Sequence, residues 1–137
     1  MTTELTKEFL RHHTWAVVGV SSDHNKYGYK VYAQLKKAGY TVYPVNPKLK
    51  EIEGFPCFPN LRSLPETPEV VNVVVPPSVT EQIAEQCAAL GISRIWMQPG
   101  AESPNAIRLA EKHHINVVHH QCVLIALQPF RPGLQSD

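Results

Sequence analysis

No stretch of the sequence approaches the roughly 20 consecutive apolar residues that a membrane-spanning helix needs. The first 13 residues, MTTELTKEFLRHH, also lack the apolar segment of a secretory signal. We therefore expect no membrane contact and a cytoplasmic location for the protein.

Cysteine is scarce, and no excess of charge of one sign is present. Cys57, Cys87 and Cys122 are far apart and form no C-x-x-C pair, so neither a disulfide framework nor a thiolate zinc site is predicted. The chain has 13 Lys or Arg and 12 Asp or Glu, a net charge of +1. Proteins that coat nucleic acid are normally strongly basic, so we expect no nucleic-acid partner.

The composition that remains predicts one well-packed domain. The 137 residues are 43% hydrophobic and 18% charged, so the whole chain, 1–137, forms one domain with its core at about 14–122 and a loosely ordered tail at 129–137. The charge is uneven, because residues 24–50 contain six lysines and no acid. This pattern fits either a solvated helix face or a surface that binds a phosphorylated small molecule.

Short β-rich apolar runs alternate with stretches of helical periodicity. Strands are predicted at residues 14–20, 40–45, 70–75, 93–97 and 115–118. Helices are predicted at 4–11, 27–37, 78–90 and 104–113, with one short helix near 60–64 inside an otherwise extended connection. This alternation indicates an α/β, three-layer Rossmann-like doubly wound fold with a mostly parallel five-stranded sheet.

Local signals refine three of these elements. Pro44 has no N–H group to donate, so the strand at 40–45 should lie near an edge of the sheet. Ser78, followed by Glu81, predicts a capping box, and Ser103 before Pro104 predicts a second helix start.

Ligands of doubly wound sheets bind beyond the carboxyl ends of the strands, so the residues there are candidates for a site. After the first strand, Gly19 permits close approach of a ligand, and Ser21, Ser22 and Lys26 precede a helix N-terminus suited to phosphate. The G-x-G-x-x-G fingerprint is missing, because Ser21 and His24 replace two of its glycines. An ordinary strand-to-helix turn is the alternative.

The other strand ends supply an ammonium group, two prolines and an amide, and none supplies a carboxylate. Lys48, in the segment Asn46, Pro47 and Lys48, would attract a phosphate on a ribose where NAD-binding folds usually carry an acid, unless it is only an exposed turn residue. Val75, Pro76 and Pro77 form a stiff apolar surface suited to a flat base, or simply end the strand. Gln98 and Gly100 could bind an amide-rich arm.

These motifs together resemble a known family. The segments VVGVSS, KYGYKV, GYTVYPVNPK, EIEGFPCFPNL, VNVVVPPS and IWMQPG, in this order, are similar to the small bacterial and archaeal CoA-binding proteins. That family is in turn similar to the N-terminal CoA-binding domain of the succinyl-CoA synthetase alpha subunit. The resemblance covers about residues 14–122, and it implies coenzyme A or an acyl-CoA as the ligand.

The resemblance also implies a role for each strand end. Gly19, Ser21, Ser22 and Lys26 would receive the diphosphate, and Asn46, Pro47 and Lys48 would lie beside the phosphorylated ribose. Val75, Pro76 and Pro77 would pack on the adenine, and Gln98 and Gly100 would lie beside the pantetheine arm. The family often has D-R-C near its end, where this chain has His120, Gln121 and Cys122.

We expect neither a catalytic residue nor a metal site. No Ser-His-Asp order or carboxylate pair is evident, and adjacent histidines such as His119 and His120 normally diverge. The phosphorylated histidine and the nucleotide-binding machinery of the synthetases lie in further domains, for which this chain has no room. Cys122 is either a structural cysteine or a thiol that forms a mixed disulfide with CoA.

The resulting hypothesis is a stand-alone CoA-binding domain that acts as a sensor, carrier or partner-regulating module, as a homodimer or with a protein partner. Two alternatives remain open. One is an NADP-type redox protein in which Lys48 reads the ribose phosphate, and the other is an interaction domain without a ligand.

Overall fold

The computed structural model describes residues 4–128, so the tail predicted at 129–137 lies outside the described residues. Its centre is a five-stranded sheet in the order β2-β1-β5-β6-β7, with every neighbouring pair parallel. The strands are β1 (Thr14–Val18), β2 (Thr41–Val45), β5 (Val70–Val73), β6 (Arg94–Met97) and β7 (Asn116–Val118). The predicted α/β doubly wound architecture is therefore confirmed.

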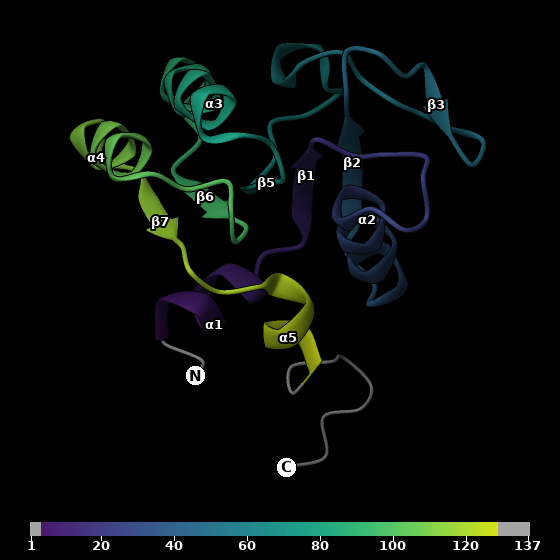
Figure 1. Cartoon of the computed structure of the whole chain (residues 1–137), viewed down its shortest axis with the longest axis horizontal. Coiled ribbons are helices and arrows are strands. Elements are labelled where there is room, and N and C mark those ends of the chain that lie inside the picture. Colours follow the sequence, from purple (N-terminus) through teal and green to yellow (C-terminus); the bar gives the residue numbers. More distant parts are fainter. Residues whose placement is uncertain (1–3, 129–137) are drawn as a thin grey trace.

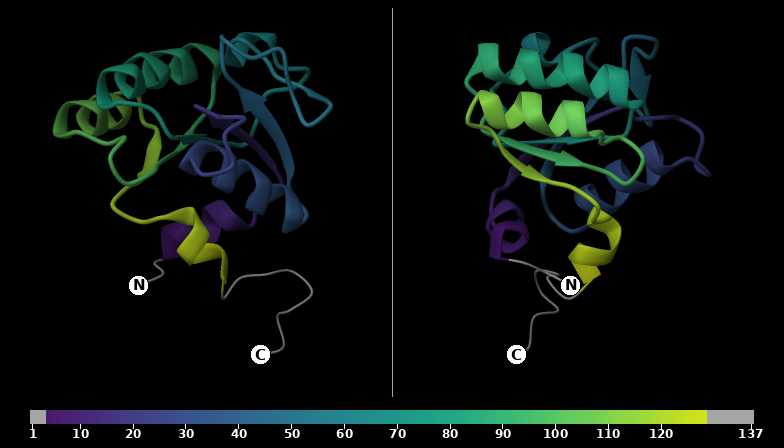
Figure 2. Two further views of the ribbon diagram at one scale, coloured as in Figure 1. Left: turned by 45° about the vertical axis from the view of Figure 1, so that its right-hand side comes forward. Right: turned by 60° about the vertical axis from the view of Figure 1, so that its left-hand side comes forward.

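Helices cover both faces of this sheet, which gives three layers (Figures 1 and 2). The helices are α1 (Glu4–Leu10), α2 (Tyr27–Lys37), α3 (Pro77–Leu90), α4 (Pro104–Lys112) and α5 (Val123–Leu127). Helices α3 and α4 lie side by side on one face, and α1, α2 and α5 cover the other. Within residues 4–128, no helix has the length and apolar character to cross a bilayer.

Buried residues alternate between the two faces along β1, as a covered parallel sheet requires. Trp15 and Val17 of β1 pack with α1, α2 and α5, whereas Ala16 and Val18 pack with α3 and α4. The first face is aromatic, with the rings of Trp15 and Trp96 centred 6.0 Å apart. Each indole N–H donates to a backbone carbonyl at 2.8 Å, so neither buried donor is unsatisfied.

The connection at 48–69 contains more structure than predicted. A two-stranded antiparallel hairpin joins β3 (Glu51–Ile52) to β4 (Phe55–Pro56), where the sequence indicated only extended chain. The predicted short helix is confirmed as the 3-10 helix η1 (Leu61–Ser63), which is capped by the Asn60 side chain. Helix α5 was not predicted either.

The local signals gave two correct predictions and one wrong one. Strand β2, which contains Pro44, lies at an edge of the sheet, and Ser103 Oγ accepts the Ala106 N–H at 3.0 Å. The predicted capping box at Ser78 is wrong, because α3 begins at Pro77 and Ser78 is its second residue. Proline suits the first helical position, since its φ is preset and its missing N–H would have had no partner there.

Candidate functional site

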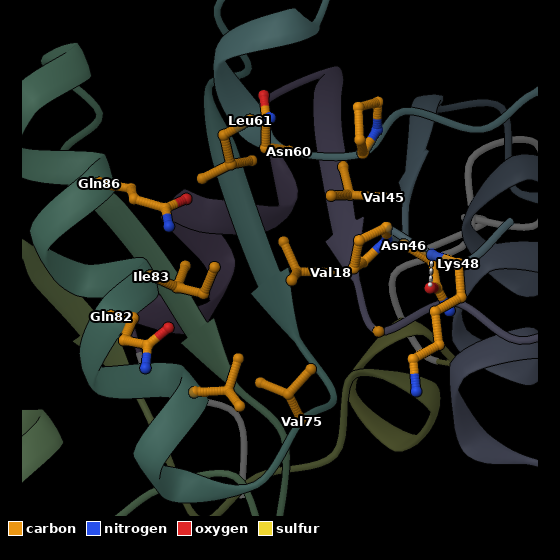
Figure 3. Close-up of a pocket in the computed structure, with 14 residues that line it drawn as sticks. Val18, Val45, Asn46, Lys48, Asn60, Leu61, Val75, Gln82, Ile83 and Gln86 are labelled. Carbon is orange, nitrogen blue, oxygen red and sulfur yellow. Dashed lines mark hydrogen bonds between the residues drawn. The ribbon is translucent and has the colours of Figure 1, made fainter. Parts of the chain in front are cut away.

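A pocket of about 460 Å³ lies at the carboxyl ends of β1, β2 and β5, facing α3 (Figure 3). Valine, leucine and isoleucine side chains form its walls, and amide side chains and one lysine stand on its rim. Its lining consists of Val18, Gly19, Val45, Asn46, Pro47, Lys48, Pro59, Asn60, Leu61, Val75, Val79, Gln82, Ile83 and Gln86. The predicted edge of the sheet therefore carries a pocket.

Gly19 forms the turn that leads out of β1 into this pocket. Its φ is +101°, in the left-handed region that favours glycine, and its N–H donates to the Val45 carbonyl at 3.0 Å. A Cβ atom at Gly19 would overlap the carbonyl oxygen of Val74 and stand 2.8 Å from a methyl group of Val75. Glycine is needed here because the ends of β1 and β5 meet at this point.

The loop after Gly19 holds its shape through short-range hydrogen bonds. Ser21 Oγ accepts the N–H of Asp23 at 3.0 Å, and Asp23 Oδ1 accepts the N–H of Asn25 at 2.9 Å. Lys26 is the N-cap of α2 and makes no side-chain cap. Among the described residues, the N–H groups of Tyr27 and Gly28 have no acceptor, so this helix end can receive an anionic oxygen.

Asn46 fixes the turn after β2. Its Nδ2 donates to the Val20 carbonyl at 2.8 Å, and its Oδ1 accepts the N–H of Lys48 at 2.8 Å. The Asn46 amide thereby ties the loop after β2 to the loop after β1. Lys48 is exposed and lies across the pocket from Gln82 and Gln86 in Figure 3, where its ammonium group can meet a phosphate.

Gln98 is buried, with 3% exposure, and its side-chain amide is used inside the protein. Its Oε1 accepts from Asn72 Nδ2 at 3.3 Å and from the Val123 N–H at 3.0 Å, and its Nε2 donates to Cys122 Sγ at 3.3 Å. These bonds join β6 to the start of α5. Asn72 Oδ1 is the one buried side-chain polar atom of residues 4–128 without a hydrogen-bond partner.

The structure brings some of the predicted ligand contacts together in the pocket and places the others around it. Those that line the pocket are Gly19, Asn46, Pro47, Lys48 and Val75. Ser21, Ser22 and Lys26 lie in the loop between β1 and α2, Pro76 caps α3 and Pro77 begins it, and Gln98 and Gly100 follow β6. Ligand contact by each of these residues stays a prediction.

Sequence reasoning missed the α3 side of the pocket. Val79, Gln82, Ile83 and Gln86 have the spacing i, i+3, i+4, i+7, which places them on one helix face. That spacing is visible in the sequence and could have identified them. No sequence signal distinguishes Asn60, which joins the pocket because the chain before η1 runs beside the end of β2, where the Asn46 N–H donates to the Phe58 carbonyl at 2.9 Å.

His119 and His120, which follow β7, do not diverge as adjacent side chains normally do. His120 has φ of +60°, outside the strand, and this turn brings His119 Nδ1 within 2.6 Å of His120 Nδ1. His120 Nε2 stands 3.6 Å from Glu102. Across residues 4–128, however, no group of three His, Cys, Asp or Glu side chains could hold a metal ion.

Comparison with known proteins gives a consistent set of similarities. A family model described as a CoA binding domain matches residues 13–128. Acetate–CoA ligase [ADP-forming] I of Archaeoglobus fulgidus is 31% identical over 118 residues, which are 79% of this chain and 17% of the ligase. The uncharacterized protein YneT of Bacillus subtilis is 26% identical, with 81% of this chain and 82% of YneT covered.

Solved structures agree with these similarities. A conserved hypothetical protein from Pyrococcus furiosus is 37% identical with a TM-score of 0.80, covering 83% of this chain and 98% of that one. A hypothetical protein from Pyrococcus horikoshii OT3 is 27% identical with a TM-score of 0.85, covering 93% and 90%. The chain spans only 16% to 26% of the first three ligase relatives.

Proposed function

Because the chain belongs to the CoA binding domain family, we propose that it binds coenzyme A or an acyl-CoA at the carboxyl edge of its sheet. It acts there as a stand-alone binding module without catalysis of its own. The observation that carries this proposal is the pocket of about 460 Å³ in which the Gly19 turn, Lys48 and the apolar face of α3 meet.

The adenine end of the ligand belongs in this pocket. Val18, Val75 and Ile83 offer flat apolar contact to the faces of a base, and Gln82 and Gln86 offer amide donors and acceptors to its edge. Pro76 and Pro77 lie at the start of α3 and directly follow Val75 of this wall. The pocket volume lies within the usual range for small-molecule sites.

The phosphates of the ligand belong on the side of the sheet edge that carries Lys26 and Lys48. The N–H groups of Tyr27 and Gly28 and the positive end of the α2 dipole suit the diphosphate, with Ser21, Ser22 and Lys26 beside it. Lys48, on the turn fixed by Asn46 and followed in the chain by Lys50, suits the ribose phosphate.

The pantetheine arm runs from there toward β6. Since the Gln98 amide is already hydrogen-bonded inside the protein, Gln98 serves this arm as a positioning residue rather than as a direct partner. The arm then meets the backbone near Gly100, whose φ of +95° turns the chain at this edge.

The wider role is that of a sensor, a carrier or a regulator of a partner, as a homodimer or with another protein. The ligases that the chain resembles are much longer, since the matched segment covers only 16% to 26% of them, and this chain corresponds to one part of them. Three free cysteines support a reducing compartment, which is why we place the protein in the cytoplasm.

Isothermal titration calorimetry with CoA, acetyl-CoA, NAD and NADP tests the proposal. We expect heat from CoA or acetyl-CoA and none from NAD. Binding of NADP alone would favour the redox alternative, and no binding of any of the four would favour an interaction domain. Native mass spectrometry of freshly purified protein would reveal CoA that is retained through purification.

A further inference from the structure

The β3–β4 hairpin brings a carboxylate to the loop between β1 and α2. Glu53 occupies the hairpin turn with φ of +51°, and Gly54 follows with φ of +85°. Glu53 Oε2 accepts a hydrogen bond from the Tyr29 hydroxyl at 2.7 Å and lies 3.2 Å from His24 Nε2. Tyr29 belongs to the first turn of α2, and His24 lies two residues before Lys26.

The three side chains form a closed set of contacts. The His24 ring stacks on the Tyr29 ring with centroids 4.0 Å apart and an interplanar angle of 16°. We call His24, Tyr29 and Glu53 the clasp. It joins the loop after β1, the first turn of α2 and the hairpin that follows Lys48, so it joins both loops on the basic side of the proposed site.

The hairpin is a firm support for the clasp. Ile52 is 2% exposed and belongs to the aromatic core on the α2 face, and Lys36 of α2 stands 2.9 Å above the centre of the Phe55 ring. Glu53 is therefore attached to a segment that is anchored on both sides. The loop at 21–26, by contrast, is exposed apart from Ser21 and holds itself mainly by short-range bonds.

We propose that Glu53 is a positioning residue for the bound ligand, holding the loop at 21–26 and the first turn of α2 in the conformation that receives phosphate. This inference rests on the proposed binding of CoA at that helix end. A site that is ordered before binding loses less conformational entropy when the ligand arrives, which raises affinity.

No single contact of the clasp contributes enough free energy to hold the loop alone. His24 and Glu53 are 65% and 49% exposed, and an ion pair at such a surface contributes little by itself. The ring stack and the phenol hydrogen bond add to it, and the Glu53 hydrogen bond raises the pKa of the Tyr29 hydroxyl, which keeps this donor protonated. The clasp thus depends on all three groups together.

The opposite effect is also physically reasonable, since a carboxylate near a polyanionic ligand repels it. His24 and Tyr29 face the Glu53 carboxylate directly, and the nearby Lys36 and Tyr32 of α2 also interact with its charge. If repulsion dominates, removal of the charge strengthens binding. If positioning dominates, removal of the side chain weakens it.

Calorimetry of CoA binding to the variants E53A, E53Q and E51Q separates these two effects. Glu51 lies on the same hairpin, is exposed, and makes no side-chain hydrogen bond or ion pair among the described residues, so E51Q is a matched control for the loss of one charge. We expect E53A to weaken CoA binding about three- to tenfold, as expected from the ordering of one or two side chains. E53Q, which keeps an acceptor for Tyr29, should lose less, and E51Q should not weaken binding.

One further measurement excludes a merely structural effect. Hydrogen exchange of the unliganded protein should be faster in E53A than in the wild type over residues 21–30, with no change in the sheet.

Equal strengthening by E53Q and E51Q would overturn the inference, as would E53A binding CoA like the wild type with unchanged exchange. Failure of the proposed function is a different result, because then the wild type itself would not bind CoA. In that case faster exchange in E53A would still show that Glu53 orders the loop, and unchanged exchange would refute even that.

Discussion

The carbonyl oxygen of Gly19 lies where a Cβ atom of residue 28 would stand, so the end of β1 and the first turn of α2 meet through Gly19 and Gly28. In dinucleotide-binding folds the third glycine of the fingerprint provides this close packing of helix and strand. Here His24 holds that position of the motif, and Gly28, four residues later, provides the contact. The spacing of the fingerprint is thus absent, but the helix–strand packing that its third glycine provides is present.

Gly28→Ala should therefore both destabilise the protein and weaken CoA binding. The added methyl group must push α2 away from β1, and overpacking of this kind typically lowers the free energy of unfolding by about 1–3 kcal/mol. Urea denaturation measures the first effect and calorimetry the second. Lys37→Ala is the control, because Lys37 is exposed near the end of the same helix. Equal stability losses in both variants would contradict the packing argument.

Substitution of Gly19 is a poorer test of the proposed diphosphate contact than the sequence suggests. From the sequence alone, a side chain at Gly19 would be expected to obstruct the diphosphate and spare the core. The structure shows that it would first collide with the Val74 carbonyl, so a loss of binding in such a variant could come from a displaced strand end.

Lys26 and Lys48 should bind different phosphates of the ligand. Lys26→Ala should weaken CoA and dephospho-CoA alike, by about tenfold or more, since one charge-assisted hydrogen bond to the diphosphate is lost. Lys48→Ala should weaken CoA but leave dephospho-CoA, which lacks the ribose phosphate, nearly unchanged. Calorimetry with both ligands gives the comparison, with Lys112→Ala at the end of α4 as the control. The same loss for both ligands in Lys48→Ala would refute the assignment of the ribose phosphate.

A large side chain on the pocket face of α3 should exclude the adenine. Gln86 is exposed on the rim of the pocket, so Gln86→Trp should reduce CoA affinity strongly while the thermal unfolding midpoint stays near the wild-type value. Ala89 is exposed on the same helix but does not line the pocket, which makes Ala89→Trp the matched control. Undiminished CoA binding by Gln86→Trp would place the adenine elsewhere.

The sequence predicted those features that follow from repeated local patterns. Short β-rich apolar runs identified all five strands of the main sheet, and Pro44 indicated the edge, because a missing N–H has the same consequence in any fold. Since the carboxyl ends of parallel strands share one edge, the sequence also predicted that Gly19, Asn46 and Val75 lie close together, as they do in the pocket.

The features that it missed depend on tertiary context. The Glu53–Gly54 turn is a weaker hairpin signal than Asn-Gly, so the hairpin was not predicted. Helix α5 is only five apolar residues long and has no polar periodicity to reveal it. The orientation of Gln98 followed from its partners Asn72 and Val123, which no local pattern connects to it.

The free energy of unfolding should decrease at acid pH because of Glu69, whose carboxylate lies at the end of the sheet opposite the pocket. The Thr14 N–H lowers the pKa of Glu69 below its ordinary value of 4.5, against the effect of burial, and His12 and His13 lower it further. Because the folded pKa is the lower one, this contribution is complete above 4.5 and is lost as the pH falls. Glu69→Gln should therefore unfold at lower urea than the wild type at pH 7, and the difference should shrink toward pH 3. Glu111→Gln, exposed on α4, is the control.

The three thiols should differ in reactivity by their burial. Burial raises the pKa of the Cys87 thiol to about 12, and burial also raises the pKa of Cys57. Cys122 is half-buried, and its Sγ faces Gln98 at the proposed pantetheine end of the site. At pH 8, iodoacetamide should therefore modify Cys122 first, and Cys87 only after unfolding, which peptide mass spectrometry can measure. Faster modification of Cys87 than of Cys122 would contradict this order.

The same peptides decide between the two interpretations of Cys122. On incubation with CoA disulfide, attack by the Cys122 thiolate would form a protein–CoA disulfide and release one CoA thiol, provided that the ligand thiol lies within reach. We expect this adduct only if the pantetheine arm passes Gln98, so Lys48→Ala, which weakens CoA binding, should slow its formation. No adduct, or one formed at the same rate in Lys48→Ala, would make Cys122 a structural residue with no contact to the ligand.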